Sequence, residues 1–208
     1  MREYMNGYYI TLKREPYLSR MQTFESKFDI FYGFDKQYAG KHCHHWGLGE
    51  KVTDKLKFVY GNSYSHYLLF RHLSTINWTS HFVFVLEDDV VFYEDWEHNW
   101  ENYSHYIPND AELIYLHHHP SHEKKFGTHI DYALNEYIGK PLGPFSTTSY
   151  AITKQCVCKL LNYIDTHKIY RSFDSLLNIE RENYNIYTLV HSICYENKGI
   201  YKSERLNN

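Results

Sequence analysis

The chain has 208 residues, of which 43% are hydrophobic and 23% charged, and its formal net charge is −3. A sequence of this length and composition buries a continuous core, so we expect a single domain over residues 1–208. It lacks the excess of basic residues that binding to nucleic acid requires. It also lacks an apolar run long enough to span a bilayer, so we expect no transmembrane segment.

The cysteines are scattered along the chain, and their spacing matches neither a disulfide framework nor a zinc site. They are Cys43, Cys156, Cys158 and Cys194. The N-terminal residues also lack the apolar segment of a secretion signal. We therefore expect reduced thiols and a cytoplasmic protein.

Hydrophobic patterning predicts alternating strands and helices in the first half of the chain. A strand from Tyr8 to Leu12 is followed by a helix that begins at Pro16 and ends near Lys27, because proline suits the first turn of a helix. A second strand, Phe28 to Tyr32, precedes a helix from Asn62 to about Ile76. The apolar run His81 to Leu86 then predicts a buried central strand.

The second half of the chain alternates in the same way. A strand from Glu112 to Leu116 leads into a long loop, rich in His, Gly and Pro, that ends near Ser146. The remaining elements are a strand, two helices and a last strand, at Thr148–Ile152, Lys154–Tyr163, Phe173–Glu182 and Tyr184–Val190. Strands that alternate with helices predict an α/β fold with a mostly parallel sheet covered on both faces.

Three consecutive acids, Glu87, Asp88 and Asp89, end the predicted central strand. Adjacent carboxylates repel one another unless positive charge lies among them, and ligands of open α/β sheets bind beyond the carboxyl ends of the strands. Mg²⁺ or Mn²⁺, held by one or two carboxylates and by the oxygens of a nucleotide diphosphate, would supply that charge. The alternative is a solvated acidic turn that caps the next helix, near Glu94 and Asp95.

Four segments of the chain, in this order, resemble glycosyltransferase family 25, which includes bacterial lipopolysaccharide galactosyltransferases and their collagen-modifying relatives. The segments are Tyr9-Ile10-Thr11-Leu12-Lys13-Arg14 with Arg20 downstream, Tyr64-Ser65-His66, Leu86-Glu87-Asp88-Asp89-Val90, and Ser146-Thr147-Thr148-Ser149-Tyr150-Ala151-Ile152 followed by Lys159-Leu160-Leu161. The sequence departs from the family pattern at Thr11, where asparagine is usual, and at Ser146, where glycine is usual.

The resemblance implies a GT-A fold, which is Rossmann-like and has a mixed, mostly parallel central sheet flanked by helices. It implies an inverting transfer of a hexose from a nucleotide-diphosphate sugar, most simply a UDP-sugar, to a hydroxyl of a glycan or glycoprotein. It also implies a Mn²⁺ or Mg²⁺ cofactor held by Asp89, with Glu87 and Asp88 near the ribose and the sugar of the donor. The setting it implies is the cytosol of a bacterium or of a virus-infected host cell.

The same resemblance gives four further residues a place in the donor site. Thr11, Leu12 and Arg14 leave the first strand where a nucleotide would lie. A guanidinium matches phosphate geometry, although Arg14 is equally well explained as a surface arginine. His66 matches the family's histidine at a helix start, yet it lies on the apolar stripe of its helix, so a buried core histidine is the alternative.

Asp174 and His191 are candidates for the base and for a second metal ligand. An inverting transfer needs a general base for the acceptor hydroxyl, and Asp174 stands where the family places an aspartate; a helix N-cap is the alternative. His191 ends the last predicted strand, where GT-A enzymes often supply a second metal ligand. An ordinary strand-end histidine is the favoured alternative.

Two histidine-rich segments, at 42–45 and 117–122, do not repeat the spacing of a closed zinc site and are interpreted as loop histidines. The second segment follows a predicted strand and would line an acceptor cleft, and residues 126–145 would form a lid over the donor. Two other functions remain open. A metal-dependent nucleotidyltransferase or phosphohydrolase would use the same acids, and a non-catalytic sugar-binding module would need no metal.

Overall fold

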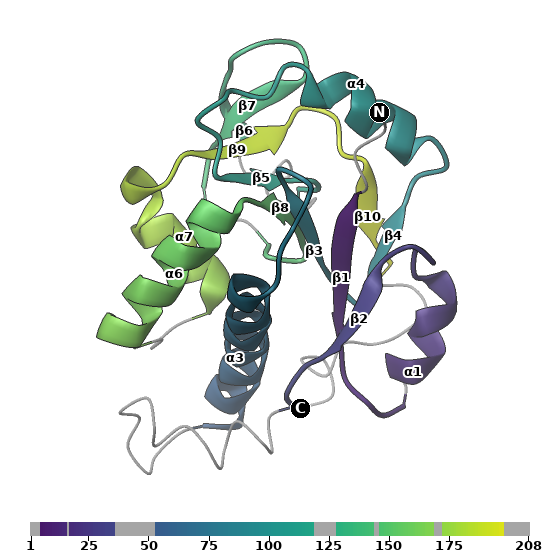
Figure 1. Ribbon diagram of the computed structural model, residues 1–208, viewed down its shortest axis with the longest axis vertical. Coiled ribbons are helices and arrows are strands. Elements are labelled where there is room, and N and C mark those ends of the chain that lie inside the picture. Colours follow the sequence, from purple (N-terminus) through teal and green to yellow (C-terminus); the bar gives the residue numbers. More distant parts are fainter. Residues whose placement is uncertain are drawn as a thin grey trace.

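The computed structural model describes residues 5–15, 17–35, 53–118, 128–143, 146–168 and 172–197. Their strands form an eight-stranded sheet in the order β2-β1-β3-β8-β5-β9-β7-β6 and a two-stranded sheet of β10 and β4. Helices lie against both faces of the large sheet (Figure 1). The strands are β1 (Asn6–Thr11), β2 (Asp29–Tyr32), β3 (Val83–Glu87), β4 (Val90–Phe92), β5 (Leu113–Tyr115), β6 (Ile130–Ala133), β7 (Ile138–Pro141), β8 (Ser149–Ile152), β9 (Ile186–Leu189) and β10 (Cys194–Glu196).

All strands of the large sheet except β7 and β8 run in one direction. β1 is parallel to β2 and β3, and β5 is parallel to β9, whereas β8 is antiparallel to both of its neighbours, β3 and β5. The β6–β7 hairpin joins the sheet through antiparallel pairing of β7 with β9. The predicted fold class, a mixed and mostly parallel sheet flanked by helices, is therefore confirmed. The carboxyl ends of β1, β2, β3, β5 and β9 meet at one edge, which we call the carboxyl edge.

Alternation along β3 divides the core into two halves. Val83 and Val85 face one cluster, which packs under α3, α6 and α7, and Phe84 and Leu86 face the other cluster, which packs under α4. Successive side chains of a strand point to opposite faces, so each half of the core receives every second residue. The helices are α1 (Tyr17–Arg20), α3 (Asp54–Thr75), α4 (Trp96–Ser104), α6 (Lys154–His167) and α7 (Phe173–Ile179), with short 3₁₀ turns at Met21–Thr23 and Arg181–Asn183.

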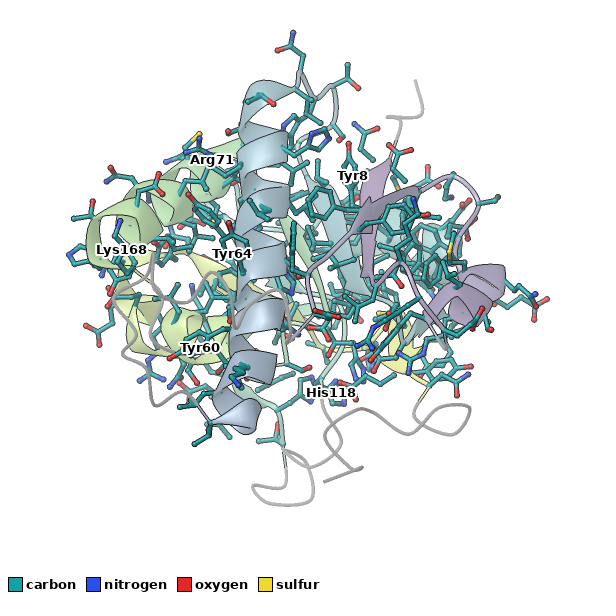
Figure 2. All side chains as sticks on the ribbon, turned by 90° about the horizontal axis from the view of Figure 1, so that it is seen from below. Tyr8, Tyr60, Tyr64, Arg71, His118 and Lys168 are labelled. Carbon is teal, nitrogen blue, oxygen red and sulfur yellow. The ribbon has the colours of Figure 1, made fainter. Side chains whose placement is uncertain are left out.

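The two faces of α3 serve different neighbours. Figure 2, which views the molecule from below, shows Tyr64 on the side of α3 toward α6 and Tyr8 of β1 on its other side. The ring of Tyr8 packs edge-on against His72, with ring centroids 5.7 Å apart. The hydroxyl of Tyr67 donates to Asp165 of α6 at 2.7 Å. α3 therefore fastens the first strand to the C-terminal helices.

Two predicted helices have different bounds in the structure. The helix expected from Pro16 to Lys27 is wrong in length, because α1 and its 3₁₀ turn end at Thr23; Pro16 itself lies outside the described residues. Phe24 then adopts an extended backbone, and its ring stacks on Tyr9 with centroids 4.0 Å apart. In contrast, α3 begins earlier than expected, since the side chain of Thr53 accepts from the amide of Leu56 and caps the helix.

The segment expected to be a long loop contains two strands within its described part. Residues 130–133 and 138–141 form the β6–β7 hairpin of the large sheet, so this part of the expected lid is sheet and not loop. Asn135 organises the hairpin turn, because its side-chain oxygen accepts from the amides of Tyr137 and Ile138, both at 2.9 Å. Residues 42–45, 119–122, 126–127 and 144–145 lie outside the described residues.

The described cysteines, Cys156, Cys158 and Cys194, are free thiols, while Cys43 lies outside the described part of the chain. Among the helices that the structure describes, none combines the length and the apolar character needed to cross a bilayer.

Candidate donor site at the carboxyl edge

The acidic turn Glu87-Asp88-Asp89 lies at the carboxyl edge, directly after β3. Glu87 is the last residue of β3, and β4 begins immediately after Asp89. Because β4 separates the turn from α4, the three acids do not cap that helix. The capping alternative is therefore wrong, and the position of the turn beyond a central strand is one where α/β sheets bind ligands.

Glu87 points toward α3, on the same face as Val83 and Val85. Its Oε1 accepts from Asn62 Nδ2 at 3.0 Å and lies 3.6 Å from His66 Nε2. The other ring nitrogen of His66, Nδ1, is 2.7 Å from the Tyr150 hydroxyl, and Phe173 stacks on the ring with centroids 5.3 Å apart. His66 is fully buried. It therefore behaves as the core histidine of the alternative interpretation, and its Nε2, which has no hydrogen-bond partner among the described residues, faces the Glu87 carboxylate.

Asp88 points to the opposite face and is held by two side chains. Its Oδ2 accepts from Thr11 Oγ1 at 2.9 Å, and its Oδ1 accepts from Arg20 Nη1 at 2.6 Å. Burial raises the pKa of Asp88 to about 6, while Arg20 and Thr11 act in the other direction. The Arg20 and Asp88 side chains are 9% and 12% exposed, so this ion pair is shielded from water. Arg20 is thus the positive charge that the acidic turn needs for one of its three carboxylates.

Asp89 has the least compensated carboxylate of the turn. Burial, followed by the charges of Glu87, Glu196 and Asp88, raises its pKa to about 7. Its Oδ1 is buried and has no hydrogen-bond partner among the described residues. A buried carboxylate oxygen without a donor is costly, and a bound water or ion is one of the ways in which such an atom is satisfied in a folded protein.

Glu196, which sequence reasoning missed, brings a fourth carboxylate to the turn. It is the last residue of β10 and pairs with Val90 of β4, and the amide of Asn197 donates to the Asp89 carbonyl at 2.7 Å. Glu196 Oε1 accepts from Thr148 Oγ1 at 2.9 Å and from Ser146 Oγ at 3.2 Å. The polar tail gave no signal of a strand, because a three-residue strand such as β10 is specified by its partner and not by its own pattern.

A small cavity of about 110 Å³ opens beside the acidic turn, between the ends of β1 and β2 and the side of α3. Thr11, Leu12 and His66 line it together with Glu87 and Asp88, so it gathers five of the six predicted donor residues. The other lining residues are Ile10, Tyr17, Phe34, Asp35, Asn62 and Ser65. Arg14 lies beside the cavity, because its Nε is 3.7 Å from Oδ2 of the lining residue Asp35.

Asp174 and His191 are the predicted residues that the structure places farther from the turn. Asp174 is in the first turn of α7, where its Oδ1 accepts from the amide of Ser175 at 2.8 Å. Its charge acts on Tyr115, whose pKa is raised mainly by burial, so Asp174 lies close to the end of β5. His191 is exposed, in the bend after β9, and makes no hydrogen bond or ion pair with the acidic turn in the described part of the chain.

Part of the second histidine segment also reaches the carboxyl edge, after β5. The rings of His118 and His129 stack with centroids 3.6 Å apart, and Ser192 Oγ is 2.9 Å from His118 Nδ1. His118 is labelled in Figure 2. Within the described ranges no three His, Cys, Asp or Glu side chains are placed to hold a metal ion by themselves.

An acidic turn and a cavity at the carboxyl edge of a mostly parallel sheet are typical of α/β proteins that bind their ligands beyond the strand ends. Residues 5–177 match the model of glycosyltransferase family 25, described as a lipopolysaccharide biosynthesis protein. The chain belongs to glycosyltransferase family 25 and is a glycosyltransferase, with the GT-A fold that the resemblance implied.

One curated relative is the procollagen lysyl hydroxylase and glycosyltransferase of Acanthamoeba polyphaga mimivirus, which is 35% identical over 80 residues. The match covers 38% of this chain and 8% of the viral protein. Among solved structures, apo mouse xyloside xylosyltransferase 1 has a TM-score of 0.43 at 12% identity, with 90% of this chain and 84% of that chain covered. The galactosyltransferase LgtC, with donor and acceptor sugar analogues, has a TM-score of 0.41 at 13% identity, with 84% and 70% covered.

Proposed function

We propose that this glycosyltransferase moves a hexose from a UDP-sugar to a hydroxyl of a glycan or glycoprotein, with inversion, and that it needs Mn²⁺ or Mg²⁺. The observation that carries the proposal is the buried Asp89 Oδ1, which has no hydrogen-bond partner among the described residues although three further carboxylates lie nearby. UDP is the proposed nucleotide because the family that the sequence resembles includes galactosyltransferases.

The residues of the turn fit a hard divalent cation. Oxygen ligands are the ones that Mg²⁺ and Mn²⁺ prefer, and Mg²⁺ is commonly held by one or two carboxylates plus substrate phosphates. Asp89 would hold the cation, and because the described residues offer no closed set of three ligands, the donor diphosphate would complete the site. When bound, the cation neutralises negative charge that develops on the departing diphosphate.

The other acids of the turn have separate tasks in this proposal. Asn62 orients Glu87, and Thr11 and Arg20 orient Asp88, so both carboxylates are pre-positioned to accept from donor hydroxyls. Fixed acceptors of this kind orient a substrate without an entropy cost at the moment of reaction. Arg14, whose side chain is 40% exposed beside Asp35, would turn toward the diphosphate.

Asp174 is the proposed general base. Its placement supports the role, because it lies at the N-terminal turn of α7, next to the His66 ring through Phe173, and its charge reaches Tyr115 at the end of β5. A carboxylate there would take the proton of the acceptor hydroxyl as the hydroxyl attacks the anomeric carbon. The departure of UDP from the other face of that carbon gives inversion.

Thermal-shift measurements with nucleoside diphosphates test the proposal. UDP with Mn²⁺ is expected to raise the melting temperature of the wild-type protein, because a ligand that binds only the folded state stabilises it by mass action. UDP alone and Mn²⁺ alone are expected to have small effects, and Asp89→Asn is expected to abolish the combined shift. An equal shift for UDP with and without Mn²⁺ would overturn the metal requirement, and no shift with any diphosphate would overturn the donor class.

Product analysis separates the transferase from the other enzymes that use such an acidic turn. A phosphohydrolase would cleave the diphosphate of the sugar nucleotide with water and would need no other acceptor, and a nucleotidyltransferase would pass a nucleoside monophosphate to a phosphate acceptor. The proposed transferase releases UDP, and its rate of UDP release rises when an acceptor glycan is supplied. UDP-sugar consumption that is equally fast with and without every acceptor glycan offered would favour the hydrolase.

A further inference from the structure

His66 presents one of its two ring nitrogens to the cavity beside the acidic turn. His66 lines that cavity, and its Nδ1 faces Tyr150, which does not line it. Nε2 is on the other side of the ring, 3.6 Å from Oε1 of Glu87, which is another lining residue. This nitrogen is buried and has no hydrogen-bond partner in the described part of the chain. An unpaired polar atom that is buried costs free energy, and a ligand oxygen in the cavity would remove that cost.

The position of the hydrogen on the His66 ring depends on Tyr150. Tyr150 belongs to β8 and is fully buried, and among the described residues the only hydrogen-bond partner of its hydroxyl is His66 Nδ1, at 2.7 Å. Burial, followed by the charge of Glu87, raises the pKa of this hydroxyl well above its usual value, so the hydroxyl keeps its hydrogen. A buried O–H group needs an acceptor. Tyr150 therefore donates to Nδ1, and the single hydrogen of the neutral imidazole is on Nε2.

The opposite tautomer is unfavourable for two reasons. With the hydrogen on Nδ1, the Tyr150 hydroxyl would accept that hydrogen, and its own hydrogen would have no acceptor within the described ranges. The lone pair of Nε2 would also face the Glu87 carboxylate, which repels it. The ring has little room to turn away, because it is fully buried and Phe173 stacks on it with centroids 5.3 Å apart.

We propose that Tyr150 is a positioning residue of the donor site, because it holds His66 in the tautomer whose Nε2–H donates to an oxygen of the bound sugar nucleotide. This inference rests on the proposed nucleotide-sugar donor. Hydroxyl oxygens of the ribose and of the hexose accept hydrogen bonds of this kind. A site that offers a fixed hydrogen bond to a substrate group binds ligands without that group less well. Tyr150 acts through His66, since it does not reach the cavity itself.

Nitrogen NMR of the protein without ligands tests the tautomer. In protein labelled with ¹⁵N at histidine, couplings from the carbon-bound ring hydrogens show which nitrogen of His66 carries hydrogen. The measurement is made at about pH 8, above the ordinary titration range of histidine, and His66→Gln identifies the signal by its loss. The hydrogen is expected on Nε2. A hydrogen on Nδ1 would overturn the proposal.

Calorimetric titration with UDP and with UDP-galactose, at saturating Mn²⁺, tests the hydrogen bond to the ligand. Tyr150→Phe is expected to weaken the binding of UDP-galactose by about three- to tenfold, the effect of losing one hydrogen bond. Tyr187→Phe is the matched control, because its buried hydroxyl donates to Asp110, before the start of β5, at 3.1 Å; it should keep wild-type affinity. An equal loss for UDP assigns the oxygen to the UDP part, and a loss confined to UDP-galactose assigns it to the hexose. Wild-type affinity of Tyr150→Phe for both ligands would overturn the proposal.

Substitutions of His66 separate positioning from a structural role. The amide nitrogen of glutamine reaches the place of Nε2 and always carries hydrogen, whereas the amide nitrogen of asparagine reaches only the place of Nδ1. His66→Gln is therefore expected to keep most of the affinity, and His66→Asn to lose it. In the His66→Gln protein, adding Tyr150→Phe should have no further effect on binding, and a further loss in this double-mutant cycle would make Tyr150 structural.

The two measurements remain decisive in less favourable cases. Should Tyr150→Phe fail to fold, the tautomer of the wild type and the difference between His66→Gln and His66→Asn still decide the role of Nε2. Absence of binding of both ligands to the wild type would contradict the proposed function, while the NMR measurement would still show whether Tyr150 sets the tautomer.

Discussion

At the scale of single residues, the acidic turn is held by partners on separate elements. Asp88 depends on Arg20, which lies at the end of α1 and is separated from it by 68 positions in the sequence. Both side chains are largely buried, so neither is well solvated without the other. Breaking a buried ion pair from one side leaves an uncompensated charge, and this costs more than the pair contributes in isolation.

Replacing Arg20 by Met is therefore expected to destabilise the protein by about 3–5 kcal/mol at neutral pH. Arg71→Met is the matched control, because Arg71 lies 3.6 Å from Asp165 with both side chains about half exposed, and it should cost less than about 1 kcal/mol. Urea unfolding measures both values. Adding Asp88→Asn to Arg20→Met should recover part of the loss, and equal costs for the two arginine variants would contradict the argument.

At the scale of elements, the cavity beside the acidic turn depends on how closely α3 approaches the end of β2. Gly61 permits this approach, because an added Cβ would lie 2.8 Å from the carbonyl oxygen of Phe34 and 3.2 Å from the carbonyl carbon of Asp35. These are backbone atoms, and they cannot move aside as readily as the end of a flexible side chain can. Phe34, Asp35 and Asn62 all line the cavity, so its shape is set by a contact between a helix and a loop.

Gly61→Ala is expected to displace the segment after β2 and to lower kcat/KM for the donor sugar by about ten- to a hundredfold, the usual effect of a misplacement near 1 Å. The overall fold should persist, since alanine favours the helix. Gly143→Ala is the control, because no atom of the described residues lies within 4 Å of its added Cβ. Steady-state kinetics at varied donor concentration give the result, and identical kinetics in the two variants would show that the cavity does not bind the donor.

At the scale of the whole molecule, the acidic turn couples stability to pH. Burial, together with neighbouring carboxylates in the case of Asp89, raises the pKa of Asp88 to about 6 and that of Asp89 to about 7, above the ordinary value of 3.8. At pH values between 3.8 and these raised pKa values, the folded state binds more protons than the unfolded chain. The stability that these groups contribute is complete below their unfolded pKa and is lost as the pH rises through their folded pKa values.

The asparagine side chain of the Asp89→Asn variant is uncharged at every pH. Without divalent cations, the variant is therefore expected to be more stable than the wild type by about 2–4 kcal/mol near pH 8. Near pH 4, where Asp89 is protonated in the folded protein, the difference should almost vanish. Urea unfolding of both proteins at the two pH values tests this. A difference that is the same at both values would assign it to hydrogen bonding and not to charge.

The local sequence was sufficient for the elements whose own residues specify them. The apolar run of β3 and the three acids after it predicted a central strand and a site at its end, because a run of apolar residues is stable only when buried. The helix α6 was predicted from its amphipathic pattern. The expected bounds were Lys154–Tyr163, and the observed bounds are Lys154–His167. Glu87, Asp88, Thr11 and Leu12 meet at the cavity because strands that run in one direction end at one edge.

Only the tertiary structure decided which partners surround those acids. Arg20, Asn62 and Glu196 come from a short helix, a helix side and a three-residue strand, and no local pattern marks them as neighbours of the turn. β4 and β10 exist because they pair with each other, and such pairing over a long sequence separation is stabilised by contacts and not by propensity. The sequence by itself thus determined the fold class and the place of the acidic turn, since burial and strand direction follow from local pattern. The compensation of charge within the site depends on distances across the fold, which local pattern does not contain.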